Sequence, residues 1–221
     1  MNNVLIELQG VSFRYPDGKI ILEGFDFQIM SNDLLIIQGE SGAGKSTFLR
    51  LFNRFCDPTE GTIYFRGRDI REYQIERLRG SIVYLHQIPF MTEGTIEENL
   101  SFPFSFRSNA PRAFDSEKAR EWLDYFQLDV PLSSRALHLS IGQRQRIALI
   151  RSMLLEPDVL LLDEPVSALD SGNRKLIEQK LEDLAVTRRG TVLLATHSNL
   201  DFTHAPVRRL FLDKGKMTIG Q

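Results

Sequence analysis

The sequence contains a single cysteine and no long hydrophobic run, and each absence excludes a class of protein. Among 221 residues only Cys56 is a cysteine, so no intramolecular disulfide can form. A lone thiol followed by Asp57 and Pro58 is interpreted as a packed side chain in a reducing compartment. No apolar run approaches the ~20 residues that span a bilayer, and the N-terminus lacks the pattern of a signal peptide. We therefore expect a soluble, cytoplasmic chain that reaches a membrane only through a partner.

The sequence also has no surplus of either charge. The 27 lysines and arginines nearly balance the 29 aspartates and glutamates, for a formal charge of −2. Proteins that bind phosphate backbones usually carry a basic surplus, so nucleic acid is not expected as the main partner, although a local basic patch is not excluded. The composition is 42% hydrophobic and 25% charged, which is typical of a globular domain and excludes a disordered or collagen-like chain.

The first thirty residues predict a pair of antiparallel strands. Residues 4–15 and 19–30 flank a turn at 16–18, and apolar residues alternate with polar ones in the second segment. The apolar run at 34–37 is typical of a strand buried on both faces, as in a parallel sheet. Further strands are expected at 61–65, 81–86, 159–162 and 191–195, helices at 46–55 and 173–188, and a closing hairpin at 208–219.

Residues 88–156 differ from the rest and predict a helical insert. Thr95 and Glu98 have the spacing of a capping box, and residues 116–128 carry apolar side chains at helical spacing. We expect a single α/β domain over residues 1–221, with a mainly parallel sheet core and an N-terminal antiparallel β region. The predicted core comprises residues 1–87 and 157–221, and the predicted helical subdomain comprises residues 88–156.

A glycine-rich loop follows the apolar run at 34–37 and matches the P-loop pattern. Its glycines let backbone N–H groups turn toward phosphate oxygens, and the next helix directs its positive end at the same anion. Lys45 adds a positive charge for the β- and γ-phosphates, and Ser46 offers a hydroxyl to Mg²⁺. The alternative, a merely flexible loop, is disfavoured by the position between a strand and a helix. The candidate residues are Gly39, Glu40, Ser41, Gly42, Ala43, Gly44, Lys45, Ser46 and Thr47.

A second candidate site follows the apolar strand at 159–162, where Asp163 and Glu164 stand in sequence. A carboxylate at the end of such a strand lies beside the phosphate loop and can hold Mg²⁺ directly or through water. Glu164, one residue further, is then placed to polarise an attacking water molecule. The alternative is a solvent-facing pair of carboxylates, which the accompanying P-loop makes the weaker interpretation.

Three further features are weak when taken singly. Gln87 follows the strand expected at 81–86, and His197 follows the strand at 191–195. Residues 139–143, Leu-Ser-Ile-Gly-Gln, stand at the expected start of a helix. A lone glutamine or histidine is more often a hydrogen-bonded structural residue, so only the joint order of these features favours a functional interpretation.

Together these features resemble the ATP-binding-cassette (ABC) ATPase family over essentially the whole chain. The segment at 139–143 matches the family's signature, which distinguishes it from other P-loop enzymes. The resemblance implies an ABC-type P-loop fold that binds ATP with Mg²⁺ and hydrolyses ATP. The matching features are Tyr15, the P-loop, Gln87, the signature, Asp163 with Glu164, the loop at Ser167, Ala168, Leu169 and Asp170, and His197.

The resemblance further implies an ATP-dependent homodimer in which two chains pack head to tail. ATP would lie between the P-loop of one chain and the signature of the other. Ser140, Gly142 and Gln143 would supply the signature contacts, with Ser140 and the N–H of Gly142 reaching the γ-phosphate. Asp170 would hold contacts across the dimer.

Within one chain, the resemblance implies that Tyr15 stacks on adenine. Gln87 would contact Mg²⁺ or water and report ATP to a transmembrane partner. Ser46, Gln87 and Asp163 would form the metal site. The catalytic residues would be Glu164, Lys45, Gln87 and His197, with His197 binding the γ-phosphate.

One position departs from the family pattern. The signature usually has two consecutive glycines, and here the first is Ile141. A β-branched residue disfavours positive φ. Either this backbone position is ordinary, or the γ-phosphate pocket is altered in a way that affects the rate more than the activity.

The implied function is that of the ATP-hydrolysing subunit of an ABC membrane transporter, peripheral on the cytoplasmic face of the inner membrane. Within the family, residues 81–84 and 99–104 resemble a subgroup linked to bacterial iron export and plant aluminium tolerance, whose relatives are sometimes labelled phosphate importers. Import therefore stays open beside metal export. A soluble ABC-type ATPase acting on nucleic acid or ribosomes is the other alternative, but such proteins usually carry coiled-coil insertions or two cassettes. A non-hydrolysing binding module would be expected to lack Lys45 or Glu164.

The segment from Gln87 to Phe106 is the expected docking site for the transmembrane permease subunit. It carries more apolar side chains than an exposed edge normally does. Pro89, Phe90 and Met91 are the strongest candidates, because they follow the residue expected to sense ATP. The alternative for the phenylalanines beyond Leu100 is that they pack inside the helical insert. The apolar residues are Ile88, Pro89, Phe90, Met91, Phe102, Phe104 and Phe106.

Overall fold

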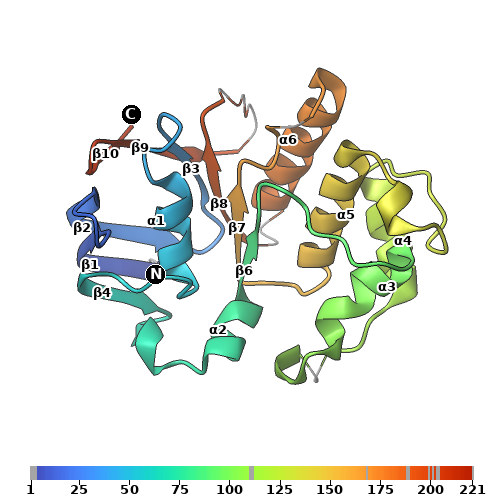
Figure 1. Cartoon of the computed structure of the whole chain (residues 1–221), viewed down its shortest axis with the longest axis horizontal. Helices are drawn as coiled ribbons and strands as arrows, with labels where there is room; N and C mark the ends of the chain where they lie inside the picture. Colours follow the sequence, from blue (N-terminus) through green and yellow to red (C-terminus); the bar gives the residue numbers. More distant parts are fainter. Residues whose placement is uncertain are drawn as a thin grey trace.

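The computed structural model contains two β-sheets and six α-helices in its described part (Figure 1). It describes residues 4–109, 112–167, 169–187, 190–198, 200, 202 and 205–220. Two predicted features fall partly outside these ranges: Ala168 of the 167–170 loop, and Arg188 at the end of the helix expected at 173–188.

The first sheet is antiparallel and comes mostly from the N-terminal residues, as predicted. Its strand order is β2-β1-β4-β5. The turn predicted at 16–18 joins its first two strands, because the N–H of Tyr15 donates to the carbonyl of Lys19 and the N–H of Gly18 donates back to Tyr15, both at 2.9 Å. The strands are β1 (Val4–Arg14), β2 (Ile20–Met30), β4 (Glu60–Phe65) and the short β5 (Arg68–Asp69).

The second sheet is parallel except for its edge strand β10, and its order is β10-β9-β3-β8-β7-β6. Its central strands are buried on both faces: Leu34 and Ile36 belong to one hydrophobic cluster, and Leu35 and Ile37 to the other. The prediction from the continuous apolar run is thus confirmed. The strands are β3 (Leu34–Gln38), β6 (Ile82–Leu85), β7 (Val159–Asp163), β8 (Thr191–Thr196), β9 (Val207–Asp213) and β10 (Lys216–Ile219).

Helix α1 (Lys45–Phe52) lies between the two sheets and contacts strands of both (Figure 1). Phe48 and Phe52 are fully buried in the cluster that joins the sheets. The helix ends three residues earlier than predicted, because Arg54 takes a left-handed conformation with φ 55°. Helix α6 (Ser171–Val186) packs against β8, and α2 (Ile75–Ser81), which the sequence did not predict, leads into β6.

The remaining helices lie within residues 88–156 and pack on one another at the right of Figure 1. The capping box at Thr95 and Glu98 is present at the start of α3. The helix predicted at 116–128 ends at Tyr125, since Gln127 has φ 51°. The division into a core and a helical subdomain remains a prediction. The helices are α3 (Ile96–Ser101), α4 (Ser116–Tyr125) and α5 (Ile141–Met153), and the 3₁₀ turns are η1 (Ile70–Glu72), η2 (Phe102–Ser105), η3 (Arg107–Asn109) and η4 (Ala136–His138).

Within the described ranges, none of the helices combines the length and the apolar character that a bilayer span requires.

Asn99 fixes the turn that leads into α3, and its removal provides a test of the packing there. The side chain is fully buried; its Oδ1 accepts from the N–H and hydroxyl of Thr92, and its Nδ2 donates to the carbonyls of Thr92 and Thr95. We expect Asn99→Ala to lower the free energy of unfolding by about 2 to 3 kcal/mol, because it leaves buried polar groups unpaired. Thr95→Ala, which removes only a helix cap, should cost about 1 kcal/mol. Urea unfolding without nucleotide measures both, and equal losses would contradict the role given to Asn99.

Candidate functional site

The loop between β3 and α1 requires glycine at two positions for different reasons. Gly44, the N-cap of α1, has φ 110°, and a Cβ there would lie 2.5 Å from Cγ2 of Ile21. A Cβ on Gly39 would lie 2.4 Å from the carbonyl oxygen of Leu212. Both contacts are closer than real Cβ atoms approach other atoms, so the backbone can follow this path only with glycine. Because Gly44 has no side chain, no side chain caps the helix start, which is available for an anion.

Lys45 is the buried cation of this loop. Its side chain is 7% exposed, and its Nζ donates to the carbonyl oxygens of Gly39 at 2.8 Å and Glu40 at 3.1 Å. Oε1 of Glu164 lies 3.6 Å from the same nitrogen. A buried ammonium group needs such oxygen partners. The loop therefore holds a fixed positive charge at its centre.

Ser46 and Asp163 meet across the site. The Ser46 hydroxyl donates to Oδ1 of Asp163 at 2.8 Å, and the hydroxyl of Tyr84 donates to Oδ2. Asp163 is the last residue of β7 and only 4% exposed. The predicted proximity of the P-loop and the strand-end carboxylate is therefore present in the structure. Burial and the neighbouring Asp163 carboxylate raise the pKa of Tyr84, so its phenol remains protonated and able to donate.

Glu164 is buried and held from several sides. Its Oε1 lies 2.8 Å from Nδ1 of His197, and its Oε2 accepts from the hydroxyl of Thr196 at 3.3 Å. Its N–H donates to the carbonyl of Ala195, and its backbone has φ 49°, which is sparsely populated for a residue with a side chain. Such a conformation costs about 1–3 kcal/mol and persists where the surroundings fix it. Here strand β8 and the residue that follows it supply these surroundings.

Gln87 contacts the same region through Ser167. Its Nε2 donates to the Ser167 hydroxyl at 3.3 Å, and that hydroxyl donates to the carbonyl of Glu164 at 3.1 Å. The predicted Gln87, Glu164 and His197 thus come together, from the ends of β6, β7 and β8. Neighbouring parallel strands place their carboxyl ends at one edge of a sheet, and ligands bind there in open α/β folds.

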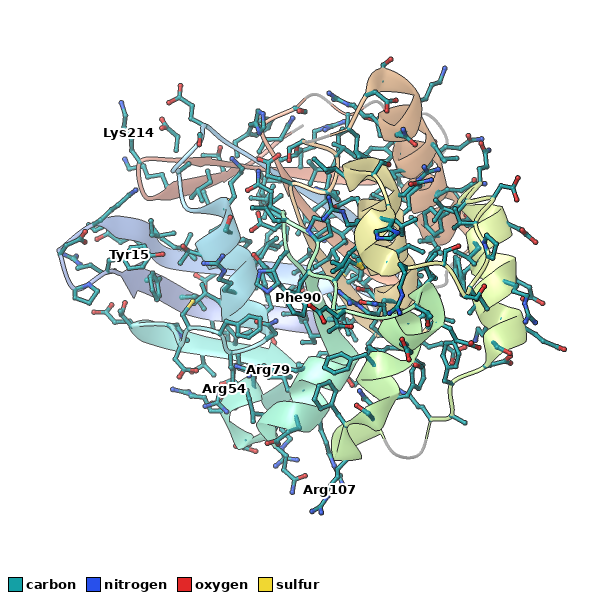
Figure 2. The ribbon with its side chains drawn as sticks, turned by 45° about the vertical axis from the view of Figure 1, so that its right-hand side comes forward. Tyr15, Arg54, Arg79, Phe90, Arg107 and Lys214 are labelled. Carbon is teal, nitrogen blue, oxygen red and sulfur yellow. The ribbon has the colours of Figure 1, made fainter. Side chains whose placement is uncertain are left out.

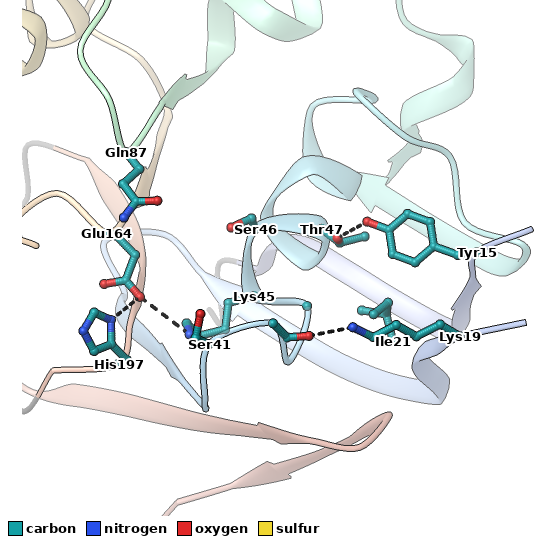
Figure 3. Close-up of a pocket in the computed structure, with 12 residues that line it drawn as sticks. Tyr15, Lys19, Ile21, Ser41, Lys45, Ser46, Thr47, Gln87, Glu164 and His197 are labelled. Atoms are coloured by element: carbon teal, nitrogen blue, oxygen red, sulfur yellow. Dashed lines mark hydrogen bonds and ion pairs between the residues drawn. The ribbon is translucent and has the colours of Figure 1, made fainter. Parts of the chain in front are cut away.

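These residues surround a cavity of about 470 Å³, shown in Figure 3. Glu164, His197 and Gln87 lie at one end, Tyr15 lies at the other, and Lys45 lies between them. Of the nine P-loop candidates six line the cavity; Gly39, Glu40 and Ala43 do not, although the first two accept hydrogen bonds from Lys45. The lining residues are Tyr15, Lys19, Ile21, Ser41, Gly42, Gly44, Lys45, Ser46, Thr47, Gln87, Glu164 and His197.

Three residues of this site were not predicted from the sequence. Lys19 lines the cavity, and its Nζ donates to the carbonyl of Gly42 at 2.8 Å; Ile21 lies against Gly44. Tyr84 binds Asp163 from a neighbouring strand. Lys19 and Ile21 follow the turn after Tyr15. Their closeness in sequence to Tyr15, a predicted site residue, was the one signal that could have identified them as site residues.

The signature residues lie apart from this cavity. Ser140 is the N-cap of α5: its Oγ accepts from the N–H of Gln143 at 3.2 Å, and Oε1 of Gln143 accepts from the N–H of Ser140 at 2.9 Å. Neither Ser140, Gly142 nor Gln143 lines the cavity. A single chain therefore does not bring the signature and the P-loop together.

The signature instead lies beside the start of α6. A Cβ on Gly142 would lie 3.3 Å from Leu169, which is tight, and 3.6 Å from Asn173. Asp170 caps α6 by accepting from the backbone N–H of Asn173 at 2.9 Å, and this bond, with one from the Asn173 side chain, lowers the pKa of Asp170. Ile141 is the first residue of α5, has no positive φ, and is 53% exposed. Of the two alternatives for Ile141, the ordinary backbone position is the one observed.

A second, smaller cavity of about 150 Å³ lies where docking was predicted. Ile88 and Phe90 are exposed beside it, and Figure 2 shows Phe90 between the sheet and the helices of residues 88–156. Met91 is only 8% exposed and belongs to the hydrophobic core, so the prediction that it is offered to a partner is wrong. Phe104 also packs inward, against Phe114. The lining residues are Val83, Tyr84, Leu85, His86, Ile88, Pro89, Phe90, Pro103, Arg151, Ser152 and Leu155, and together they form what we name the docking groove.

This geometry can bind a phosphate chain and act on its terminal group. Lys45 and the start of α1 supply positive charge, Ser46 and Asp163 supply oxygen ligands, and Glu164 is a buried carboxylate at the cavity end. These are the groups that phosphoryl transfer requires, since its catalysis rests on positioning and electrostatic stabilisation.

Comparisons with known proteins agree with this reading. The sequence model described as "ABC transporter" matches residues 22–167. The chain is 35% identical over 205 residues to the probable iron export ATP-binding protein FetA of Escherichia coli, covering 92% of this chain and 89% of that protein. It is 36% identical over 223 residues to ABC transporter B family member 15 of Arabidopsis thaliana, covering 96% of this chain but only 18% of that protein.

A solved structure is similar in fold. CbiO1 of Clostridium perfringens, described as part of the ABC transporter complex cbiONQ, aligns with a TM-score of 0.83 at 24% identity, over 98% of this chain and 87% of that one. This likeness extends to both sheets and the helices, and at such identity it bears on the fold alone. Since the family model covers well over half of the residues and FetA is matched over most of its length, the chain belongs to the ABC transporter family, as one of its ATP-binding ATPase domains.

Proposed function

We propose that the chain is the ATP-hydrolysing subunit of a membrane transporter, bound to the cytoplasmic face of the membrane through a permease subunit. The observation that carries this proposal is Glu164, a buried carboxylate held 2.8 Å from Nδ1 of His197 at one end of the P-loop cavity. The similarity to FetA over most of both chains supports export of a metal ion, iron, as the transported cargo. Import of another substrate, for example phosphate, is the runner-up.

In the proposed reaction, Glu164 accepts the proton of the water that attacks the γ-phosphate. Lys45 stabilises the charge on the β- and γ-phosphate oxygens, and His197 keeps the carboxylate of Glu164 in place and lies near the terminal phosphate. The ring of Tyr15, whose hydroxyl bonds Thr47 at the far end of the cavity, stacks on adenine. Little covalent chemistry is left for the protein beyond this positioning.

Ser46, Asp163 and Gln87 fit a magnesium site. All three offer oxygen atoms, which Mg²⁺ prefers, and the Ser46 hydroxyl already lies 2.8 Å from Asp163. The part of the chain that the structure describes holds no group of three or more histidine, cysteine or acidic residues that could bind a metal unaided. This suits an ion that takes its other ligands from phosphate and water. When bound, Mg²⁺ neutralises charge on the β- and γ-phosphates.

The proposed active unit is a homodimer formed with ATP. The support is that Ser140, Gly142 and Gln143 lie outside the cavity of their own chain, although their helix start is suited to an anion. A second copy in head-to-tail orientation would bring its signature to the γ-phosphate, with Asp170 at the contact. The alternative role, a soluble ABC ATPase on nucleic acid or ribosomes, would be favoured if the purified protein carried nucleic acid rather than a membrane subunit.

Glu164→Gln should nearly abolish turnover and leave ATP binding intact. Glutamine keeps the size and hydrogen bonding of the side chain but cannot accept the proton, so we expect a loss of about 10² to 10⁴ in the rate. Phosphate release and nucleotide binding are measured on the same preparations. Glu97→Gln, an exposed glutamate on α3, is the matched control and should hydrolyse ATP normally. Wild-type hydrolysis by Glu164→Gln would show that the catalytic role is misassigned.

Ile141→Glu should prevent the ATP-dependent dimer without weakening the fold. A negative charge in the first turn of α5 is favourable to the helix itself, but in the proposed dimer it faces the γ-phosphate. In Glu164→Gln protein, which should elute as a dimer with ATP and a monomer without it, adding Ile141→Glu should weaken dimerisation at least about tenfold. Ile141→Gln is the control, because glutamine has the shape of glutamate but no charge. If the Glu variant dimerises as well as the Gln variant, the signature does not face the nucleotide.

Replacing Ile88 and Phe90 by serine should detach the chain from its membrane partner. Their side chains are 81% and 67% exposed beside the docking groove. Removing exposed apolar side chains changes the stability of the isolated chain little, whereas an interface centred on these side chains loses most of its affinity. Ile219→Ser, which changes an equally apolar and 63% exposed residue on β10, is the control. Co-purification with membranes and ATPase activity of the isolated chain are measured, and retained assembly would place docking elsewhere.

A further inference from the structure

Tyr84 belongs to two sites at once. It lies on β6 and is one of the residues that line the docking groove. Its hydroxyl donates to Oδ2 of Asp163 at the end of the neighbouring strand β7. Among the described residues that line the groove, Tyr84 is the one whose side chain hydrogen-bonds to a P-loop or strand-end residue of the nucleotide site. Tyr84 is therefore a direct connection between the two.

Neighbouring side chains fix the orientation of the Tyr84 ring. His86 meets it edge-on with ring centroids 4.7 Å apart, and Phe55 does so at 5.8 Å. The guanidinium of Arg50, from α1, lies 5.8 Å from the ring centroid. His86 also lines the docking groove. A group that enters the groove would therefore contact Tyr84 and His86, one of the residues that hold its ring.

The carboxylate of Asp163 is fixed by two hydroxyl groups. Ser46 donates to Oδ1 and Tyr84 to Oδ2. Ser46 is itself a candidate magnesium ligand and would turn toward the ion. The Tyr84 hydroxyl would then be the remaining side-chain donor that orients the carboxylate. Partners of this kind orient ligands and change metal affinity 10–100-fold when removed.

We propose that Tyr84 is a positioning residue that holds Asp163 for the magnesium–nucleotide and makes this hold respond to occupation of the docking groove. The proposal rests on the proposed function for its ligand, magnesium with ATP, and adds a route by which a partner in the groove acts on that ligand. Tyr84 itself contacts neither the phosphates nor the reacting water.

Tyr84→Phe removes the hydroxyl and keeps the ring. The matched control is Tyr73→Phe, because the Tyr73 hydroxyl is also partly buried but donates to the backbone carbonyl of Phe65, in the antiparallel sheet. Mn²⁺ serves as the probe for the metal: free Mn²⁺ is followed by electron paramagnetic resonance in the presence of saturating AMP-PNP. We expect the half-saturating Mn²⁺ concentration to rise about tenfold for Tyr84→Phe and to be unchanged for Tyr73→Phe. AMP-PNP binding in EDTA should be the same for both.

The outcomes separate this proposal from the proposed function. If wild-type protein binds no AMP-PNP, the proposed ATPase function is contradicted, whatever the role of Tyr84. If wild-type protein binds Mn²⁺ with the nucleotide and Tyr84→Phe binds it equally well, the positioning role is overturned. An equal loss in both variants, or a loss of nucleotide binding in EDTA, shows a general effect on structure and also overturns it.

The link to the groove is tested by filling the groove without altering Tyr84. Phe90→Cys places a thiol beside the groove, where a bulky maleimide can be attached. Burial raises the pKa of the only native thiol, Cys56, to about 11, so at neutral pH it reacts slowly. Unsubstituted protein treated with the same maleimide is the control. The maleimide should shift half-saturation by Mn²⁺ at least about twofold in protein with Tyr84.

The same labelling in the Tyr84→Phe background completes the test. Without the hydroxyl, Tyr84 has no hydrogen bond through which a contact in the groove could reach Asp163, so the label should produce no further shift. A shift of the same size in both backgrounds would mean that the groove acts on the site by another route. The absence of a shift in either background would show that the groove and the nucleotide site are independent.

Discussion

The buried ammonium group of Lys45 is the constraint on which the nucleotide site depends. A charge so far from solvent is tolerated only among oxygen atoms, and Lys45 has two carbonyls of its own loop and the carboxylate of Glu164. The loop can present those carbonyls because Gly39 and Gly44 follow a backbone path closed to other residues. A nucleotide phosphate would replace the loop carbonyls and Glu164 as the partner of the ammonium group, so the charge is held ready without a large reorganisation.

The parallel sheet explains why the other groups converge on this charge. Strands β3, β8, β7 and β6 are neighbours in that order, and the chain leaves each of them at the same edge. The P-loop follows β3, His197 follows β8, Glu164 follows β7 and Gln87 lies just beyond β6. Residues far apart in the sequence therefore lie close together because of the order of the strands, and no sequence pattern around each residue is required. Three of these strands, β3, β8 and β7, are interior strands of the sheet, and their apolar runs remove water from the bases of the side chains that follow them.

The parts of the site that could be predicted from the sequence depend on local chemistry. The P-loop follows from glycine spacing, the capping box at Thr95 from its three-residue spacing to Glu98, and the buried strands from continuous apolar runs. Each of these patterns predicts the local structure of a segment independently of the segments that pack against it. The predicted helix ends were less accurate, because left-handed residues such as Arg54 and Gln127 end them without a glycine.

What the sequence did not predict depends on contacts between segments. Lys19 reaches Gly42 from the adjoining hairpin, and Tyr84 reaches Asp163 across a strand pair; neither has a sequence pattern of its own. Met91 was expected to be exposed because it lies among apolar residues near Gln87, but it packs into the helical cluster while Phe90 remains outside. A run of apolar residues indicates that some of them are buried, but which ones depends on the partner helices.

The two helix starts that would face the nucleotide in the proposed dimer differ in how their N–H groups are satisfied. Helix α1 begins at Gly44 with no side-chain cap, whereas α5 begins at Ser140, whose oxygen accepts from the N–H of Gln143. A serine hydroxyl that accepts one bond can still donate its proton to another acceptor. The signature can therefore contact a phosphate oxygen through the Ser140 hydroxyl and keep its helix capped. Since the capping box satisfies the helix start and Ile141 lies in helical backbone, the first of the two glycines in the usual family pattern is not needed for this helix to form.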